Sequence, residues 1–138
     1  MTNAYVAYPT GRQMSVGTLH AQVSSQIAAG AAQTVRARNQ TGKTITLTGA
    51  TGWVTTSNNQ AGTQLDITNA VPTTFLTAPM NMQTTGAIVA AGGINPANAT
   101  LANGAEALFV FTNAAGGGAT AMTDAQGVLY YRVDFISN

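Results

Sequence analysis

The fold is decided by the stretch Val128-Leu129-Tyr130-Tyr131-Arg132-Val133-Asp134-Phe135-Ile136. It is dense in aromatic and β-branched residues, which suit a pleated, half-buried surface. Because side chains alternate along a strand, its apolar residues share one face, and the other face carries Tyr130, Arg132 and Asp134. The stretch therefore predicts a strand whose core face consists of Leu129, Tyr131, Val133 and Phe135.

A second stretch of the same character precedes it, Ala107-Leu108-Phe109-Val110-Phe111. Between the two lie residues 113–127, which are rich in glycine and alanine and poor in large apolar side chains. Such a segment cannot build a core. We expect two strands joined by a long loop.

Two alternating segments earlier in the chain predict a hairpin. Residues 33–38 and residues 43–48 each alternate apolar with polar side chains, and Asn39-Gln40-Thr41-Gly42 supplies turn chemistry between them. The hairpin would bring three basic side chains together in a small patch: Arg36, Arg38 and Lys43.

Further short strands are expected along the middle of the chain. Residues 63–68 alternate and place Leu65 and Ile67 inside. Prolines interrupt residues 71–79, which favours edge strands because proline cannot donate to a ladder, and residues 87–90 form another candidate. Strands at spacings of roughly 8–12 residues with turns between them predict an all-β antiparallel sandwich or barrel.

Residues 15–27 allow two interpretations. Val16, Leu19, Val23 and Ile27 have the spacing of an amphipathic helix. A glycine and several β-branched or hydroxyl residues lower helix propensity in this segment, and an alternating pattern fits as well. We favour a strand.

The domain organisation is simple. At 138 residues the chain is one domain, long enough to bury a core, and we assign it to residues 15–138. Residues 1–14 lack a sustained period and are predicted to form an extended N-terminal arm. Within the arm, Tyr5, Tyr8 and Arg12 are of types enriched at interfaces and are the candidate interface residues. A loosely packed terminus is the alternative.

The composition favours assembly. Charged residues make up 7% of the chain, against roughly 25% in an average soluble domain. A net charge of +1 gives no electrostatic footprint for nucleic acid or an anionic membrane. Like-charge repulsion against self-association is weak, so extensive protein contacts are expected. The N-terminus lacks a secretory pattern, and no stretch is apolar for long enough to span a bilayer, so we expect synthesis in the cytoplasm.

No catalytic or metal-binding pattern is present in the sequence. The chain has no cysteine, and its single histidine, His20, has no acid nearer in sequence than Asp66, so neither a zinc site nor a catalytic triad is indicated. The glycines at 116–118 lack the lysine and the following helix of a phosphate-binding loop. We therefore expect no enzyme, no cofactor and no metal.

A family resemblance adds to this reading. The run Ser25-Gln26-Ile27-Ala28-Ala29-Gly30-Ala31-Ala32-Gln33-Thr34-Val35-Arg36 resembles the opening strand pair of small jelly-roll domains of the C1q and tumour-necrosis-factor kind, which also occur in bacteriophage virion proteins. The C-terminal strand and the charge-poor composition rich in Ala, Gly, Thr and Asn fit this layout. Together they resemble a head-decoration (cement) protein of a tailed bacteriophage, or the knob of a short fibre.

The resemblance implies a structural role in a virion. It implies a β-sandwich protomer, commonly a homotrimer, that binds the major capsid protein at the capsid surface and reinforces the shell without catalysis. The alternative is a receptor- or carbohydrate-binding knob of a phage fibre, for which Trp53, Tyr130 and Tyr131 are the candidate sugar-stacking residues. Of these we expect Trp53 to lie in the core.

Overall fold

The computed structural model describes residues 12–136 of the chain. In this part nearly all regular structure is β, and its one helical element is a single 3₁₀ turn, η1 (Pro96–Asn98). The strands are β1 (Arg12–Gln22), β2 (Ala32–Arg38), β3 (Ile45–Trp53), β4 (Gln64–Thr68), β5 (Met80–Asn81), β6 (Ile88–Ala90), β7 (Thr100–Leu101), β8 (Glu106–Thr112) and β9 (Gln126–Ile136). None of the helical structure described here is long and apolar enough to cross a membrane.

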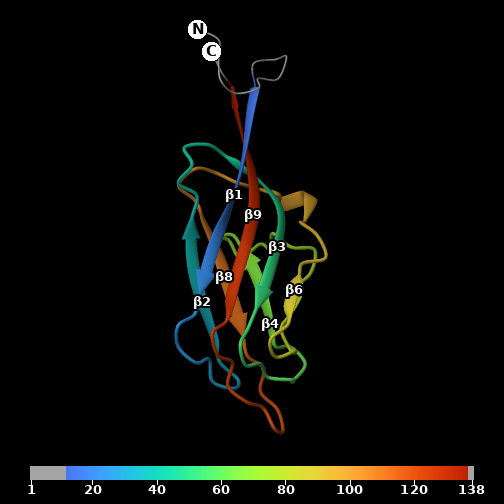
Figure 1. Ribbon diagram of the computed structural model, residues 1–138. Coiled ribbons are helices and arrows are strands. Elements are labelled where there is room, and N and C mark those ends of the chain that lie inside the picture. The colour runs from blue at the N-terminus through green and yellow to red at the C-terminus, as the bar shows by residue number, and fades with distance from the viewer. Residues whose placement is uncertain (1–11, 137–138) are drawn as a thin grey trace.

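The strands pair in a nested order. β1 pairs with β9, β2 with β8, β3 with β6 and β7, and β4 with β5, all antiparallel. The strands form two sheets, with the strand orders β1-β9-β3-β6 and β2-β8-β4-β5. Strands from the first part of the chain pair with strands from the second part in reverse order, which is the arrangement of a jelly roll. Figure 1 shows β1, β9 and β3 side by side, with β8 and β4 behind them. The predicted antiparallel, jelly-roll-like β-sandwich is confirmed.

The two strands that the sequence singled out are central. β9 lies between β1 and β3 in one sheet, and β8 lies between β2 and β4 in the other. Their inner faces meet across the sandwich, where Leu129 and Phe109 are fully buried, as predicted for Leu129. The core between the sheets is built from large side chains of both layers: Ile45, Leu47, Leu65, Ile67, Phe75, Leu76, Met80, Met82, Phe109, Phe111, Met122, Leu129 and Val133.

Two glycines let the sheets approach closely at one place. Gly52 and Gly127 face each other across β3 and β9. A Cβ atom on Gly127 would lie 2.8 Å from Leu65 Cδ2 and 2.9 Å from Phe109 Cδ2, which belong to the opposite sheet. The absence of a side chain here lets two buried residues of one sheet rest directly on the backbone of the other.

The predicted hairpin of residues 33–38 and 43–48 is wrong. β2 belongs to one sheet and β3 to the other, so the connection between them crosses the sandwich. Asn39 makes this crossing possible: it is fully buried, and its Nδ2 donates to the carbonyls of Lys43 at 2.8 Å and Leu101 at 2.9 Å. The alternating pattern predicted both strands correctly, but alternation does not indicate which strand each one pairs with. The predicted patch of Arg36, Arg38 and Lys43 depended on this hairpin, so the hairpin does not bring these three side chains together.

The remaining strand predictions are mixed. Residues 15–27 begin as a strand, β1, which continues to Gln22. β6 confirms the strand expected at 87–90. Residues 71–79, predicted as edge strands, make only single bridges, because Asn69 Oδ1 accepts hydrogen bonds from two backbone N–H groups of this segment and holds it as a turn.

A β-bulge in β3 exchanges the two faces of the strand. Up to Leu47 the odd-numbered residues are buried, among them Ile45. The pairing with β9 then shifts by one residue, and beyond the shift Ala50 and Val54 are buried instead. As a result Trp53 lies on the outer face of the sheet and outside the core, contrary to our expectation, because an extra residue in one strand reverses the side to which later residues point.

A buried amide network closes the end of the sandwich at which β8 ends and the loop to β9 begins. Asn58 and Asn113 are fully buried, and Asn58 Nδ2 donates to Asn113 Oδ1 at 2.7 Å. Asn113 Nδ2 in turn donates to the carbonyls of Ile27 at 2.7 Å and Thr120 at 3.0 Å. These bonds anchor the long loop between β8 and β9 that the sequence predicted.

Candidate functional site

The outer face of the β1-β9-β3-β6 sheet carries the half-buried Trp53 and the exposed Tyr130. The strand register places Trp53 of β3 between Gln126 of β9 and Ile88 of β6. Tyr130 lies further along β9 on the same face. Ile88 is 76% exposed and Tyr130 39% exposed, so this face is partly apolar although it borders solvent.

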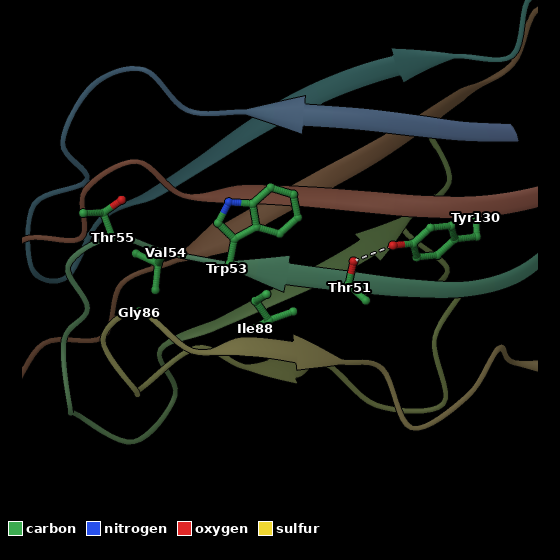
Figure 2. A pocket seen from close by; sticks show the side chains of 7 residues that line it. All are labelled: Thr51, Trp53, Val54, Thr55, Gly86, Ile88 and Tyr130. Atoms are coloured by element: carbon green, nitrogen blue, oxygen red, sulfur yellow. Dashed lines mark hydrogen bonds between the residues drawn. The ribbon is translucent and has the colours of Figure 1, made fainter.

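A groove lies on this face. It has a volume of about 540 Å³ and is lined by Thr51, Trp53, Val54, Thr55, Gly86, Ile88 and Tyr130. Figure 2 shows Thr51 and Trp53 rising from β3, with Ile88 on one side and Tyr130 at the far end. The volume falls within the range of roughly 300–1,000 Å³ that is typical of small-ligand sites. The lining contains no carboxylate, ammonium or guanidinium group.

The Trp53 ring is held in a fixed orientation. The ring of His20, from β1, stacks against it with centroids 6.2 Å apart and planes inclined by 18°. His20 is itself positioned by a hydrogen bond of 3.1 Å between its Nε2 and Gln126 Oε1. Two neighbouring strands therefore cooperate to orient the indole. Offset stacking of this kind adds to the burial energy of the rings.

Hydroxyl groups stand at the other end of the groove. Tyr130 Oη and Thr51 Oγ1 lie 3.1 Å apart and share a hydrogen bond, drawn in Figure 2. Each hydroxyl has one donor and two acceptor positions, so the pair keeps capacity for a ligand. The groove thus combines an apolar, aromatic floor with polar groups at fixed places.

The charged side chains of the described residues lie outside the groove lining. Arg36 of β2 pairs with Glu106 of β8 at 3.5 Å, on the opposite sheet. Asp66 Oδ1 accepts hydrogen bonds from the Thr74 hydroxyl at 2.6 Å and the Ile67 N–H at 2.9 Å. These contacts are structural. Across residues 12–136 no three or more His, Cys, Asp or Glu side chains converge in a way that could hold a metal ion.

Comparison with known proteins finds a solved structure with a similar fold. No protein-family model matches the chain, and no curated protein matches it in sequence. A solved structure shares its architecture. One chain of the cyanophage Pam1 capsid asymmetric unit is similar with a TM-score of 0.53 at 12% sequence identity, over 96% of this chain and 94% of that one. Because both chains are covered almost end to end, the likeness extends over the whole jelly roll.

The candidate interface residues fall at the edge of what the structure describes. Tyr5 and Tyr8 lie outside the described residues, as does most of the predicted arm at 1–14. Arg12 is the first residue of β1, where its backbone is opposite Ile136 of β9. The last three residues assigned to the arm are therefore part of the first sheet.

The groove itself was only partly visible in the sequence. Tyr130 was predicted to point outward, and it does. Trp53 was assigned to the core, because nothing in the residue pattern marks the bulge that turns it outward. Ile88 was not singled out, since a short apolar strand does not reveal which of its faces will be covered. Tyr131, another sugar-stacking candidate, packs against the core and covers Gly17.

Proposed function

We propose that this chain is a non-enzymatic virion structural protein that decorates a bacteriophage capsid and stabilises it as a homotrimer. In this proposal its partner is the major capsid protein, its place is the capsid surface, and it is made in the cytoplasm of the host. It uses no cofactor and no metal.

The observation that carries the proposal is the fold shared with a chain of the cyanophage Pam1 capsid asymmetric unit over nearly the full length of both chains. Fold alone does not define function. The low charge content of 7% also favours assembly with other proteins. The groove on the outer sheet is lined by apolar, aromatic and hydroxyl side chains without a charged group, which suits binding better than catalysis.

The surface supports a role in assembly. β1 and β2 each form one edge of their sheets, and within residues 12–136 each pairs on one side only. Unpaired N–H and C=O groups along such an edge are sites at which another chain can add. The charge content of 7% leaves little electrostatic repulsion between copies.

The mechanism would be thermodynamic linkage. A protein that binds the assembled shell, but not its separate subunits, stabilises the shell in proportion to the logarithm of its concentration over its dissociation constant. At about 100 times the dissociation constant each bound site contributes about 2.7 kcal/mol. Many such sites on one shell would oppose the pressure of packaged DNA.

The capsid role is tested with particles of the virus that encodes this chain, prepared without it. We expect the purified protein to co-sediment with the particles up to a fixed stoichiometry, and to raise the temperature at which they release DNA. Unassembled capsid protein serves as the control and should not bind. Absence of binding to assembled shells, or equal binding to unassembled subunits, contradicts the proposal.

The arm and the oligomer are tested separately. Light scattering after size exclusion should give three times the 14.0 kDa chain mass.

Deletion of residues 1–11 leaves β1 complete, so it should weaken capsid binding without lowering the melting temperature. The double substitution Tyr5→Ser and Tyr8→Ser should have the same effect with the chain length kept. Full capsid binding by both variants would refute the role of the arm.

A further inference from the structure

We infer that the groove between Trp53, Ile88 and Tyr130 is a binding site for a neutral saccharide. This inference comes from the groove and does not rest on the capsid role. A decoration protein with such a site would carry a glycan-binding surface in addition to its contact with the shell.

The first argument is the prepared aromatic surface. Trp53 is held by the stacked ring of His20, which is itself bonded to Gln126. An aromatic face carries negative potential, and it attracts the weakly positive C–H groups that line one side of a sugar ring. Because the orientation of the indole is set before the ligand arrives, little conformational freedom is lost on binding.

The second argument is the distribution of polar groups. A sugar that stacks through its C–H side presents hydroxyls at its rim, and these need donors and acceptors. The groove offers the fixed hydroxyl pair of Tyr130 and Thr51 at one end. Among the described residues none accepts a hydrogen bond from Trp53 Nε1, so the indole N–H is available to a ligand. Thr55, also in the lining, is exposed.

The third argument is charge. A sialylated or sulfated glycan carries an anion that would need a cation in the site. The lining has neither a cationic nor an anionic side chain. The nearest charged position on this face of β9 is Arg132, whose cross-strand neighbours are Val16 and Thr46 rather than groove residues. The lining therefore fits a neutral ligand.

The exposed side chain of Ile88 gives the site a wall that the fold does not require. At 76% exposure it contributes little to the core, yet it stands beside Trp53 across the β3–β6 pair. The chain offers a matched control: Val71 is 77% exposed, and it belongs to the 71–79 segment rather than to the groove lining.

The test is a glycan array that carries neutral hexose and N-acetylhexosamine oligosaccharides beside sialylated and sulfated ones, probed with the full chain. Hits are then titrated by intrinsic fluorescence, which reports on the groove alone because Trp53 is the only tryptophan. We expect binding to neutral oligosaccharides with a change in Trp53 emission. Because Trp53→Ala removes the fluorophore, the variants are compared with the parent by isothermal titration calorimetry. Trp53→Ala and Ile88→Ser should each weaken glycan binding about tenfold or more, as expected for central contacts.

The controls make the result decisive. Val71→Ser should bind the glycan as the parent does, and Ile88→Ser should keep the parental melting temperature, so a loss of glycan binding cannot be a folding defect. Three outcomes would overturn the inference. These are the absence of any neutral ligand, a preference for anionic glycans, and an oligomer that dissociates on Ile88→Ser, which would make the groove an interface between copies.

Discussion

Substitution of Gly127 by alanine is the sharpest test of how the two sheets pack. The new Cβ would stand 2.8 Å from Leu65 Cδ2 and 2.9 Å from Phe109 Cδ2. Both neighbours are fully buried, so neither can move into solvent to make room. Real Cβ contacts are not this short, and the sheets or the side chains must shift.

The magnitude follows from two opposing terms. Overpacking of a filled core costs about 1–3 kcal/mol. Replacing a strand glycine by alanine returns about 0.5–1 kcal/mol, because alanine loses less conformational freedom on folding. The difference between the two terms is a loss of up to about 2.5 kcal/mol in the free energy of unfolding, and we expect about 1–2 kcal/mol because neither clashing neighbour can move aside. For a chain of 138 residues, where each kcal/mol shifts the melting temperature by roughly 3 °C, the melting temperature should fall by about 3–6 °C.

Thermal and urea unfolding followed by circular dichroism would measure both quantities. Gly117→Ala is the matched control, because its Cβ would meet nothing within 4 Å and the position has no positive φ. In the background of Leu65→Ala, which removes one clashing atom, Gly127→Ala should cost at least about 0.5 kcal/mol less, as expected for residues in contact. Equal melting temperatures for the Gly127 and Gly117 variants would refute the close approach of the sheets at this point.

Three further predictions concern the buried and exposed polar groups. Asn113→Ala should lower the free energy of unfolding by about 2 kcal/mol or more, measured by urea denaturation, because it removes three buried hydrogen bonds, to the Asn58 amide and to the carbonyls of Ile27 and Thr120; an unchanged midpoint would contradict the network. Arg36→Ala should change stability by less than about 0.5 kcal/mol, since its pair with Glu106 is exposed, and a larger loss in the same assay would show a role beyond the ion pair. His20→Ala should reduce the near-ultraviolet circular dichroism of Trp53 while lowering the melting temperature by no more than about 3 °C, because His20 is exposed; an unaltered spectrum would show that the stacking does not orient the indole.

Local pattern was sufficient wherever the structure follows an uninterrupted period of two. The inward positions of Leu129 and Val133 in β9, and of Leu65 and Ile67 in β4, were readable from the sequence, because side chains alternate along any regular strand whatever its partner. Turn residues and strand spacing then led to the sandwich, and the resemblance led to the jelly roll. The loop that follows β8 was also readable, since glycine and alanine provide no core.

Pairing and the outer groove required the whole molecule. An alternating pattern predicts that a segment is a strand. That β2 pairs with β8 depends on the tertiary arrangement of the whole chain. The groove depends further on one bulge: it moves Trp53 from the side expected for an unbroken strand to the side that faces His20 and Ile88. The sequence by itself determined the strands and their faces, because these follow from local alternation. The tertiary structure alone decided which strands meet and which aromatic residues reach the surface, because register shifts and sheet crossings arise from contacts between distant segments.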